Sequence, residues 1–338
     1  MVRLLINSAS YKQYYLTLLT NLIMALCLLT GCANTPQPSI SPQPATNEAA
    51  LKDLEILASD TMQGRKPGSS GHEAARNFIT TRFHTLGLKA FSKNYQQVFS
   101  FSQGFQQQTG YNLIGWLEGT EFAETFIVIT AHYDHLGKLG RKTFNGADDN
   151  ASGVATLLAL ATHFAQYPPK HSLIFVATDA EEGGLHGADA FVSAPPVKMS
   201  SIVLNINLDM LGVGGKRGQL HALPAKGQSI TKAWLKQQAP RYNYPSMTLR
   251  IGTPVPTRTL GVMNKVDWHK ASDHASFADV GIPYIYFGTD VHAHYHQTSD
   301  SFTVINHDFF SAALHTVKEL LISLDDSSYS STGLTLRK

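Results

Sequence analysis

The chain lacks cysteine over most of its length. Its two cysteines, Cys27 and Cys32, lie close to the N-terminus of the 338-residue sequence. We therefore expect no disulfide in the folded body, and no thiolate there as nucleophile or metal ligand. A metal site would have to use histidine, aspartate and glutamate. A nucleophile would have to be a hydroxyl, a carboxylate or an activated water.

Charge is also scarce. Charged residues make up 15% of the chain, the formal net charge is +2, and no stretch concentrates lysine and arginine. Nucleic acid is therefore not an expected partner, because phosphate binding needs a clustered basic surface. No internal repeat is present. The apolar content of 43% is enough for the core of one large α/β domain, and the 15 histidines favour a metal or proton-transfer site.

The sequence has no apolar run of the length that spans a bilayer. The longest, Leu16–Leu29, follows Arg3 and Lys12 and is shorter than the roughly 20 residues required. This pattern is typical of the apolar region of a secretory signal. We predict that residues 1–31 form a signal peptide. A weak transmembrane anchor is the alternative.

The apolar run ends in Leu29-Thr30-Gly31-Cys32, which resembles the lipobox of bacterial lipoproteins. The resemblance implies that Cys32 is lipidated and anchors the protein to a membrane of the cell envelope. Ala33, where aspartate would suggest inner-membrane retention, favours an outer-membrane lipoprotein that faces the periplasm. Without lipidation, the protein would be secreted.

Residues 32–47 are rich in proline, glutamine, serine and threonine and predict a flexible tether. The folded domain is expected from 48 to 325, with a polar, frayed tail over 326–338. Within the domain, apolar strand candidates alternate with amphipathic helices, and several strands are continuously apolar. This pattern predicts a mostly parallel sheet covered by helices on both faces. The strands are expected at 111–117, 125–131, 172–178, 202–208 and 283–287, and the helices at 48–59, 72–86, 152–166, 185–193, 229–238 and 307–324.

Polar clusters follow the ends of these strands. The three clusters are His132-Tyr133-Asp134, Asp179-Ala180-Glu181-Glu182 and Asp209-Met210. Two further clusters lie at 145–150 and 294–300. Ligands bind at the carboxyl ends of strands in open α/β sheets, so these groups predict one shared site. Paired divalent ions need an anion between them, further nitrogen and oxygen ligands, and a free carboxylate to accept a proton from water.

Five of these segments resemble, in order, the motifs of the M28 zinc aminopeptidases. The likeness covers nearly all of residues 50–325, and Gly64-Arg65 with Pro67-Gly68 is similar to the entry segment of that family. The family implies a three-layer αβα sandwich around a mostly parallel mixed sheet, the fold of zinc-dependent exopeptidases and phosphorylase/hydrolase-like proteins. The five segments are residues 131–137, 145–154, 178–183, 207–210 and 295–300.

The resemblance also implies a ligand set for two zinc ions. His132, Asp148 and Asp209 would hold one ion. Asp148, Glu182 and His296 would hold the other, so that Asp148 bridges the two.

Further roles follow from the same resemblance. Glu181 would be the general base, and Asp134 would orient His132 through its second ring nitrogen. Asp300 would support the loop that bears His296. A cis peptide is expected between Asp148 and its neighbour Asp149.

Other nearby residues are expected to stay outside the metal site. His135, His292 and His294 lie close to candidate ligands in the sequence, but the motif spacing selects His132 and His296. The segment 272–277 resembles a part of the pocket wall in the family and is not expected to supply ligands.

The resulting hypothesis is a zinc aminopeptidase that removes N-terminal residues from peptides. Two alternatives remain open. The first is a zinc enzyme of the glutaminyl cyclase type, although the intact Asp148-Asp149-Asn150 run favours two metals and hydrolysis. The second is an inactive binding lipoprotein on the same scaffold, which the full set of candidate ligands argues against.

Overall fold

The computed structural model describes residues 44–254, 266–330 and 333–335. The predicted signal peptide, Cys32 and most of the predicted tether lie outside the described residues. In the described part of the chain, no helix combines the length and apolar character that crossing a membrane requires.

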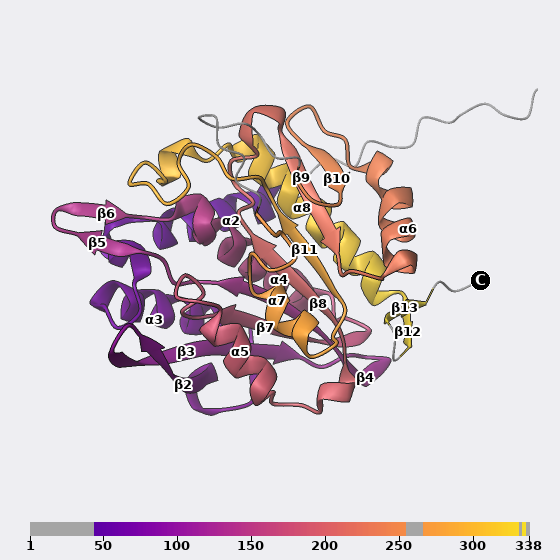
Figure 1. Cartoon of the computed structure of the whole chain (residues 1–338). Helices are drawn as coiled ribbons and strands as arrows, with labels where there is room; N and C mark the ends of the chain where they lie inside the picture. The colour runs from indigo at the N-terminus through magenta and orange to yellow at the C-terminus, as the bar shows by residue number, and fades with distance from the viewer. Residues whose placement is uncertain (1–43, 255–265, 331–332, 336–338) are drawn as a thin grey trace, which may run out of the picture. The chain divides into compact units, whose positions relative to one another are not determined.

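A mixed sheet organises the domain (Figure 1). Its order is β1-β3-β7-β4-β8-β11-β9-β10, with β2 paired to β3. The four central strands β7, β4, β8 and β11 are mutually parallel, whereas β3 and β9 run antiparallel to their central neighbours. The strands of the sheet are β1 (Lys89–Ala90), β2 (Gln96–Gln103), β3 (Gln106–Leu117), β4 (Phe122–His132), β7 (His171–Thr178), β8 (Ile202–Asp209), β9 (Gln219–Pro224), β10 (Thr248–Ile251) and β11 (Tyr284–Gly288).

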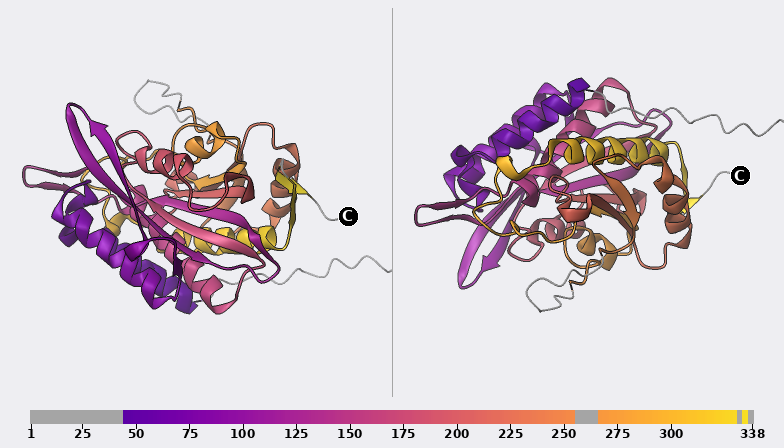
Figure 2. Two further views of the ribbon diagram at one scale, coloured as in Figure 1. Left: turned by 90° about the horizontal axis from the view of Figure 1, so that it is seen from below. Right: turned by 90° about the horizontal axis from the view of Figure 1, so that it is seen from above.

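Helices cover both faces of this sheet, which confirms the predicted three-layer αβα architecture. In Figure 2, α2, α3 and α8 lie on one side of the sheet, and α5 and α7 lie on the other. The helices are α2 (Pro44–Leu57), α3 (Ser70–Thr85), α4 (Gly153–Gln166), α5 (His186–Ser193), α6 (Ser229–Gln238), α7 (His274–Asp279) and α8 (His307–Asp325). Every residue of β7 is buried, as expected of a central parallel strand with helices on both faces.

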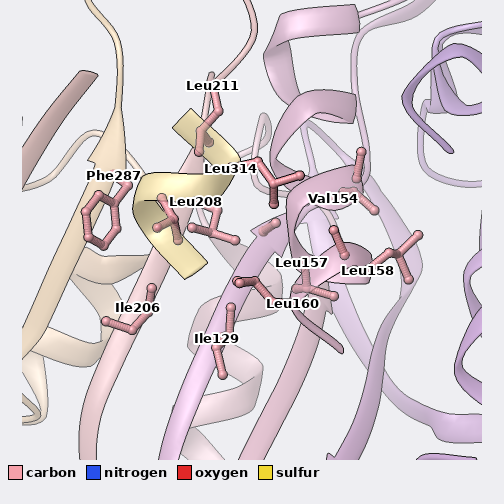
Figure 3. Packing of buried hydrophobic residues seen from close by; sticks show 14 of the residues in the cluster. Ile129, Val154, Leu157, Leu158, Leu160, Ile206, Leu208, Leu211, Phe287 and Leu314 are labelled. Carbon is pink, nitrogen blue, oxygen red and sulfur yellow. The ribbon is translucent and has the colours of Figure 1, made fainter. Parts of the chain in front are cut away.

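The core forms because side chains alternate along each central strand. Ile127 and Ile129 of β4 lie in the same apolar cluster as α4 and α8, while Val128 belongs to the cluster of α5 and α7. Figure 3 shows Leu157 of α4 and Leu314 of α8 among the side chains that face β4 and β8. The helices thereby hold the ends of β4, β7 and β8 in fixed positions.

The order of the central strands marks one edge of the sheet as the expected position for a ligand. From β4 the chain passes through α4 to β7 on one side, and then through α5 to β8 on the other side of β4. A sheet whose connections diverge in this way has its ligand crevice at the carboxyl ends of the strands at the switch point. His132 ends β4 and Asp209 ends β8, so both lie at this edge of the sheet.

Some boundaries differ from those predicted. Helix α2 begins at Pro44, so the body starts before the predicted boundary at Glu48. The expected tail contains a hairpin of β12 (Ser328–Ser330) and β13 (Gly333–Thr335), and the buried Leu334 ties it to the core. A second hairpin, β5 (Gly137–Leu139) with β6 (Lys142–Phe144), follows the His132 segment.

Candidate metal centre

The structure brings the polar ends of three strands together. His132 Nε2 lies 3.5 Å from an Asp209 oxygen and 4.0 Å from a Glu181 oxygen. Ligand atoms of these three residues all lie within 4.8 Å of one another. They come from the ends of β4, β7 and β8, as the sequence pattern predicted.

The carboxylate between the two histidines belongs to Asp149, not to Asp148. One Asp149 oxygen lies 3.3 Å from His132 Nε2, and the other lies 3.1 Å from His296 Nε2. The prediction that Asp148 supplies the shared carboxylate is therefore wrong by one residue. The reason is local, because adjacent residues on the turn η3 (Ala147–Ser152) direct their side chains to different places.

Asp148 is fully buried in another hydrogen-bond network. One carboxylate oxygen accepts from the Gly212 amide at 2.5 Å and from the Ser152 hydroxyl at 3.2 Å. The other lies 2.8 Å from His292 Nε2. Its carboxylate thus connects η3 to the segment after β8 and to the loop that carries His296.

The cis peptide also lies one residue later than expected, between Asp149 and Asn150. Asn150 fixes the turn from within. Its side-chain nitrogen donates to the Leu208 carbonyl at 2.9 Å. Its side-chain oxygen accepts from the main-chain amides of Gly153 and Met210 at 3.0 and 3.1 Å. The turn that presents Asp149 is therefore tied to the end of β8 and to the start of α4.

A second group of side chains adjoins the other oxygen of Asp149. His296 Nε2 lies 3.0 Å from one Glu182 oxygen. The second Glu182 oxygen lies 2.6 Å from Nδ1 of the buried His135, which is also 4.0 Å from Asp149. His135 was expected outside the site, and the structure places it inside the cluster. His294, by contrast, forms a hydrogen bond with the Ser299 hydroxyl, which agrees with its expected place outside the ligand set.

Asp134 and Asp300 support the site through the backbone. An Asp134 oxygen accepts from the Glu181 amide at 3.0 Å, while His132 Nδ1 lies 3.2 Å from the Asp134 carbonyl and 3.7 Å from its carboxylate. Asp300 accepts from the amides of Asp148 and Asp149 at 2.9 and 3.1 Å. Asp134 therefore contacts both His132 and the Glu181 main chain, although the expected bond from its carboxylate to His132 is replaced by one from its carbonyl. Asp300, which lies on the loop of His296, also binds the Asp149 turn.

Arg65 is 1% exposed, and its role could not be predicted from the sequence. Its guanidinium donates to the main-chain carbonyl of Tyr133 at 2.8 Å, and to those of Asn145 and Gly146 at 2.6 and 2.9 Å. A further bond reaches the Leu57 carbonyl at 2.7 Å. Arg65 thus joins the loop after His132 to the turn before Asp149. The sequence signal at this position was the similarity of Gly64-Arg65 to the entry segment of the family, which indicated no role for the guanidinium.

Burial and neighbouring charged groups shift the pKa values of the acidic and basic side chains in this cluster. Burial raises the pKa of Glu181 well above its usual value, and the nearby carboxylates of Asp209, Asp273 and Glu182 raise it further. For Asp149, burial acts in the same upward direction, but hydrogen bonds from His132 and His296 outweigh it and hold its pKa well below the usual value. Burial lowers the pKa of Arg65 to about 10, so its guanidinium remains charged at neutral pH.

The donor set fits divalent cations. Buried polar atoms without a hydrogen-bond partner include one Asp209 oxygen and one Asp134 oxygen. Leaving such atoms without partners is costly, and imidazole with carboxylate is the ligand chemistry of zinc. Ala180, Met210 and His296 also have positive φ angles of 56, 62 and 55°. Backbone of this kind is costly for residues other than glycine and gathers at functional sites.

The fold and this cluster define an α/β protein with a histidine–carboxylate centre at the carboxyl edge of its sheet. The family model of Peptidase family M28 matches residues 112–321, and the chain belongs to this family. Curated relatives include aminopeptidase YwaD of Bacillus subtilis, 32% identical over 52% of this chain and 37% of the relative. The alkaline phosphatase isozyme conversion protein of Escherichia coli is 29% identical over 57% of this chain and 59% of that protein.

Solved structures show the same fold. A Zn-dependent exopeptidase of Parabacteroides distasonis has a TM-score of 0.65 at 19% identity, covering 82% of this chain and 97% of that one. The glutaminyl cyclase of Bacteroides thetaiotaomicron has a TM-score of 0.64 at 18% identity, and the match covers 82% of this chain and 97% of that one. The chain spans less than two thirds of the length of the first curated relatives that it matches.

Proposed function

We propose that the protein is a zinc-dependent aminopeptidase that uses two metal ions. The proposal rests on the position of Asp149, because its two carboxylate oxygens face imidazoles from separate segments. Two cations can share such a carboxylate. His132, Asp149 and Asp209 would hold one ion, and Asp149, Glu182 and His296 would hold the other. His135, bonded to Glu182, would fix the orientation of that ligand.

Metal ions bound there would polarise the scissile carbonyl and make a water acidic enough to attack near neutral pH. The chain supplies the proton transfer. The Glu181 carboxylate lies 4.0 Å from His132 Nε2, and its burial raises its pKa, as a group that accepts and returns a proton requires. Glu181 takes a proton from the attacking water and donates it to the leaving amine, so that the peptide bond breaks with its protons balanced.

Asp134 keeps Glu181 in place for this step. Its carboxylate binds the Glu181 amide at 3.0 Å, while its main chain holds His132 from the other side. The base and the ligand therefore share one support. A displacement of Asp134 would disturb both at once.

A Glu181→Gln variant tests the base assignment. We expect it to retain the bound metal and to lose at least about 10²-fold in kcat, since general base catalysis is of this magnitude. Glu124→Gln, at the exposed far end of β4, is the control and should match the wild type. Metal content by plasma emission spectroscopy and hydrolysis of aminoacyl p-nitroanilides are the two measurements. Near-normal turnover in Glu181→Gln would refute the role.

The glutaminyl cyclase alternative is tested in the same assay. A peptide with N-terminal glutamine distinguishes release of the residue from cyclisation with loss of ammonia. Release of free amino acids supports the aminopeptidase, whereas pyroglutamyl peptide with no hydrolysis would favour the cyclase. Metal-free protein that stays inactive in both assays after zinc is added would favour a binding protein.

The cellular localisation of the protein is a separate proposal. We propose that Cys32 carries a lipid that anchors the protein in the bacterial cell envelope, with the peptidase domain facing the periplasm. Cell fractionation of the wild type and of Cys32→Ser tests it. The wild type should sediment with membranes and the variant should not; equal sedimentation would contradict lipid anchoring.

A further inference from the structure

A basic cavity lies beside the end strand of the sheet, apart from the metal centre. Its volume is about 650 Å³, and it lies among β9, β10, the end of α6 and the turn before β9. Three cationic side chains line it, namely Arg217, Lys236 and Arg250. All three are exposed. Gln219 and Asn243 add amide groups to the lining.

The described residues place no carboxylate in the lining of this cavity. The residues that line the cavity include no aspartate or glutamate, and no ion pair in the described part of the chain involves Arg217, Lys236 or Arg250. One acid, Asp290, acts electrostatically on His221 in the lining; it follows β11 and is not itself among the lining residues. A cavity of this composition attracts anions, and amides beside arginine suit a carboxylate.

The sheet register relates the cavity to the metal centre. Asp209 is paired with Gly288, Gly288 with His221, and His221 with Arg250. These residues form one row across β8, β11, β9 and β10, so Arg250 lies at the same sheet edge as the centre. With neighbouring strands about 4.8 Å apart, the row places the Arg250 backbone roughly 14 Å from that of Asp209.

This separation matches a short peptide. An extended chain advances about 3.3 Å per residue, so roughly four residues span the distance from the metal centre to the cavity. We infer that this cavity binds a carboxylate of the peptide substrate, about four residues beyond the N-terminal residue that is removed. The inference rests on the proposed aminopeptidase function and deepens it, because it adds a preference for short or acidic peptides.

Peptides with leucine followed by alanines, from two to six residues long, test the inference. Each is prepared with a free C-terminal carboxylate and as the C-terminal amide. For the wild type we expect kcat/KM to favour the acid over the amide by about three- to tenfold at four to five residues, as a few exposed charge pairs can supply. For dipeptides, kcat/KM should show no preference for the acid that the cavity could cause. High salt should reduce the acid preference of the longer peptides.

A second arm separates the two sources of carboxylate. Amidated pentapeptides with glutamate at the fourth or fifth position should regain the preference if side-chain carboxylates also bind. If they do not, while free C-termini are preferred, the cavity recognises the chain end. Both results support the inference, since each requires a carboxylate at the same distance.

Matched charge variants locate the effect. Arg250→Gln and Lys236→Gln should reduce the acid-to-amide ratio towards one, and the double variant should abolish it. Arg241→Gln and Lys232→Gln each remove one charge nearby without touching the lining, and they should keep the wild-type ratio. Isothermal titration of zinc-loaded Glu181→Gln with the tetrapeptide acid and amide measures binding without turnover.

The inference would be overturned if the wild type showed no acid preference at these lengths, or if the double variant kept it. It would also fall if the two control variants lost the preference equally, because a long-range effect of net charge would then explain it. Failure of the proposed function is distinguishable. In that case the wild type would release no amino acid from any peptide or p-nitroanilide, whatever its C-terminus.

Discussion

The carboxylate of Asp148 lies 2.8 Å from Nε2 of His292, on the loop that also carries His296. This contact separates the two adjacent aspartates by role. Asp148 holds the loop, while Asp149 faces the histidines of the metal centre.

The first prediction compares Asp149→Asn with Asp148→Asn. Asp149→Asn should bind less than half of the wild-type metal and lose at least about 10³-fold in kcat/KM, because it removes the proposed shared ligand. Asp148→Asn keeps one oxygen acceptor, so it should retain metal and lose about 10- to 100-fold, the range for groups that support ligands. Metal content and peptide hydrolysis measure both. The opposite order would return the bridging role to Asp148.

The sequence predicted much of this fold because its signals are local. The apolar runs that became β4, β7 and β8 specify buried parallel strands, and the polar groups after them predicted where the site lies. The register within Asp148-Asp149-Asn150 could not be predicted in the same way. Which of two neighbouring carboxylates faces the histidines depends on the backbone of η3. That backbone is fixed by the side chain of Asp300 and by the bond from the Met210 amide to Asn150.

The roles of Arg65 and His135 could not be predicted from the sequence for a related reason. Arg65 acts on main-chain carbonyls, which every residue has, so no residue type marks its partners. His135 was set aside on motif spacing, yet the chain turns back after Asp134 and brings its ring to Glu182. Both roles depend on tertiary contacts between segments far apart in the sequence.

The second prediction concerns Arg65. Replacing it with methionine leaves four main-chain carbonyls without their donor, three of them in buried bonds, so we expect the free energy of unfolding to fall by at least about 3 kcal/mol. Arg65→Lys can satisfy only part of this set and should be intermediate. Arg82→Met removes a partly exposed pair with Asp53 and should cost about 1 kcal/mol or less.

A purely structural role for Arg65 would lower stability alone. If the guanidinium sets the spacing of the His132 and Asp149 loops, Arg65→Lys should also bind zinc at least about 10-fold more weakly under conditions where it is fully folded. Chemical denaturation and competition with a zinc chelator separate the two effects. Wild-type zinc affinity in folded Arg65→Lys would contradict the positioning role.

The third prediction is a pH dependence of metal binding. Burial lowers the pKa of His296 in the metal-free protein, but hydrogen bonds to Asp149 and Glu182 outweigh it and raise the value to about 10. Protonated His296 therefore stabilises the metal-free fold fully below its unfolded pKa near 6.5, and this contribution is lost as pH rises through about 10. A metal must displace that proton, so zinc affinity should increase between pH 6.5 and 10.

Calorimetry in buffers with different ionisation enthalpies measures the protons released per metal bound. At neutral pH we expect net proton release, and His296→Gln should release fewer protons. His294→Gln is the control, because His294 bonds to Ser299 and is not a proposed ligand. Proton release that is unchanged in His296→Gln would show that His296 does not bind the metal.

The fourth prediction tests how closely the two ligand loops pack. Gly146 has φ +55°, and a Cβ there would collide with the Asp149 carbonyl and lie 2.6 Å from the His135 ring. Gly140 has a similar φ of +61° on the β5–β6 turn, with nothing within 4 Å of its Cβ position. Alanine at either site incurs the same cost of a left-handed backbone, about 1 kcal/mol. Only Gly146→Ala must also move the Asp149 turn away from His135.

We therefore expect Gly146→Ala to lower the free energy of unfolding by at least about 2 kcal/mol more than Gly140→Ala, as overpacking in a close-packed interior does. It should also weaken zinc binding, because Asp149 and His135 cannot both keep their positions. Gly140→Ala should bind zinc as the wild type does. Since the two variants differ in crowding and not in φ, equal stability and equal zinc affinity would show that the close approach of these loops does not shape the metal centre.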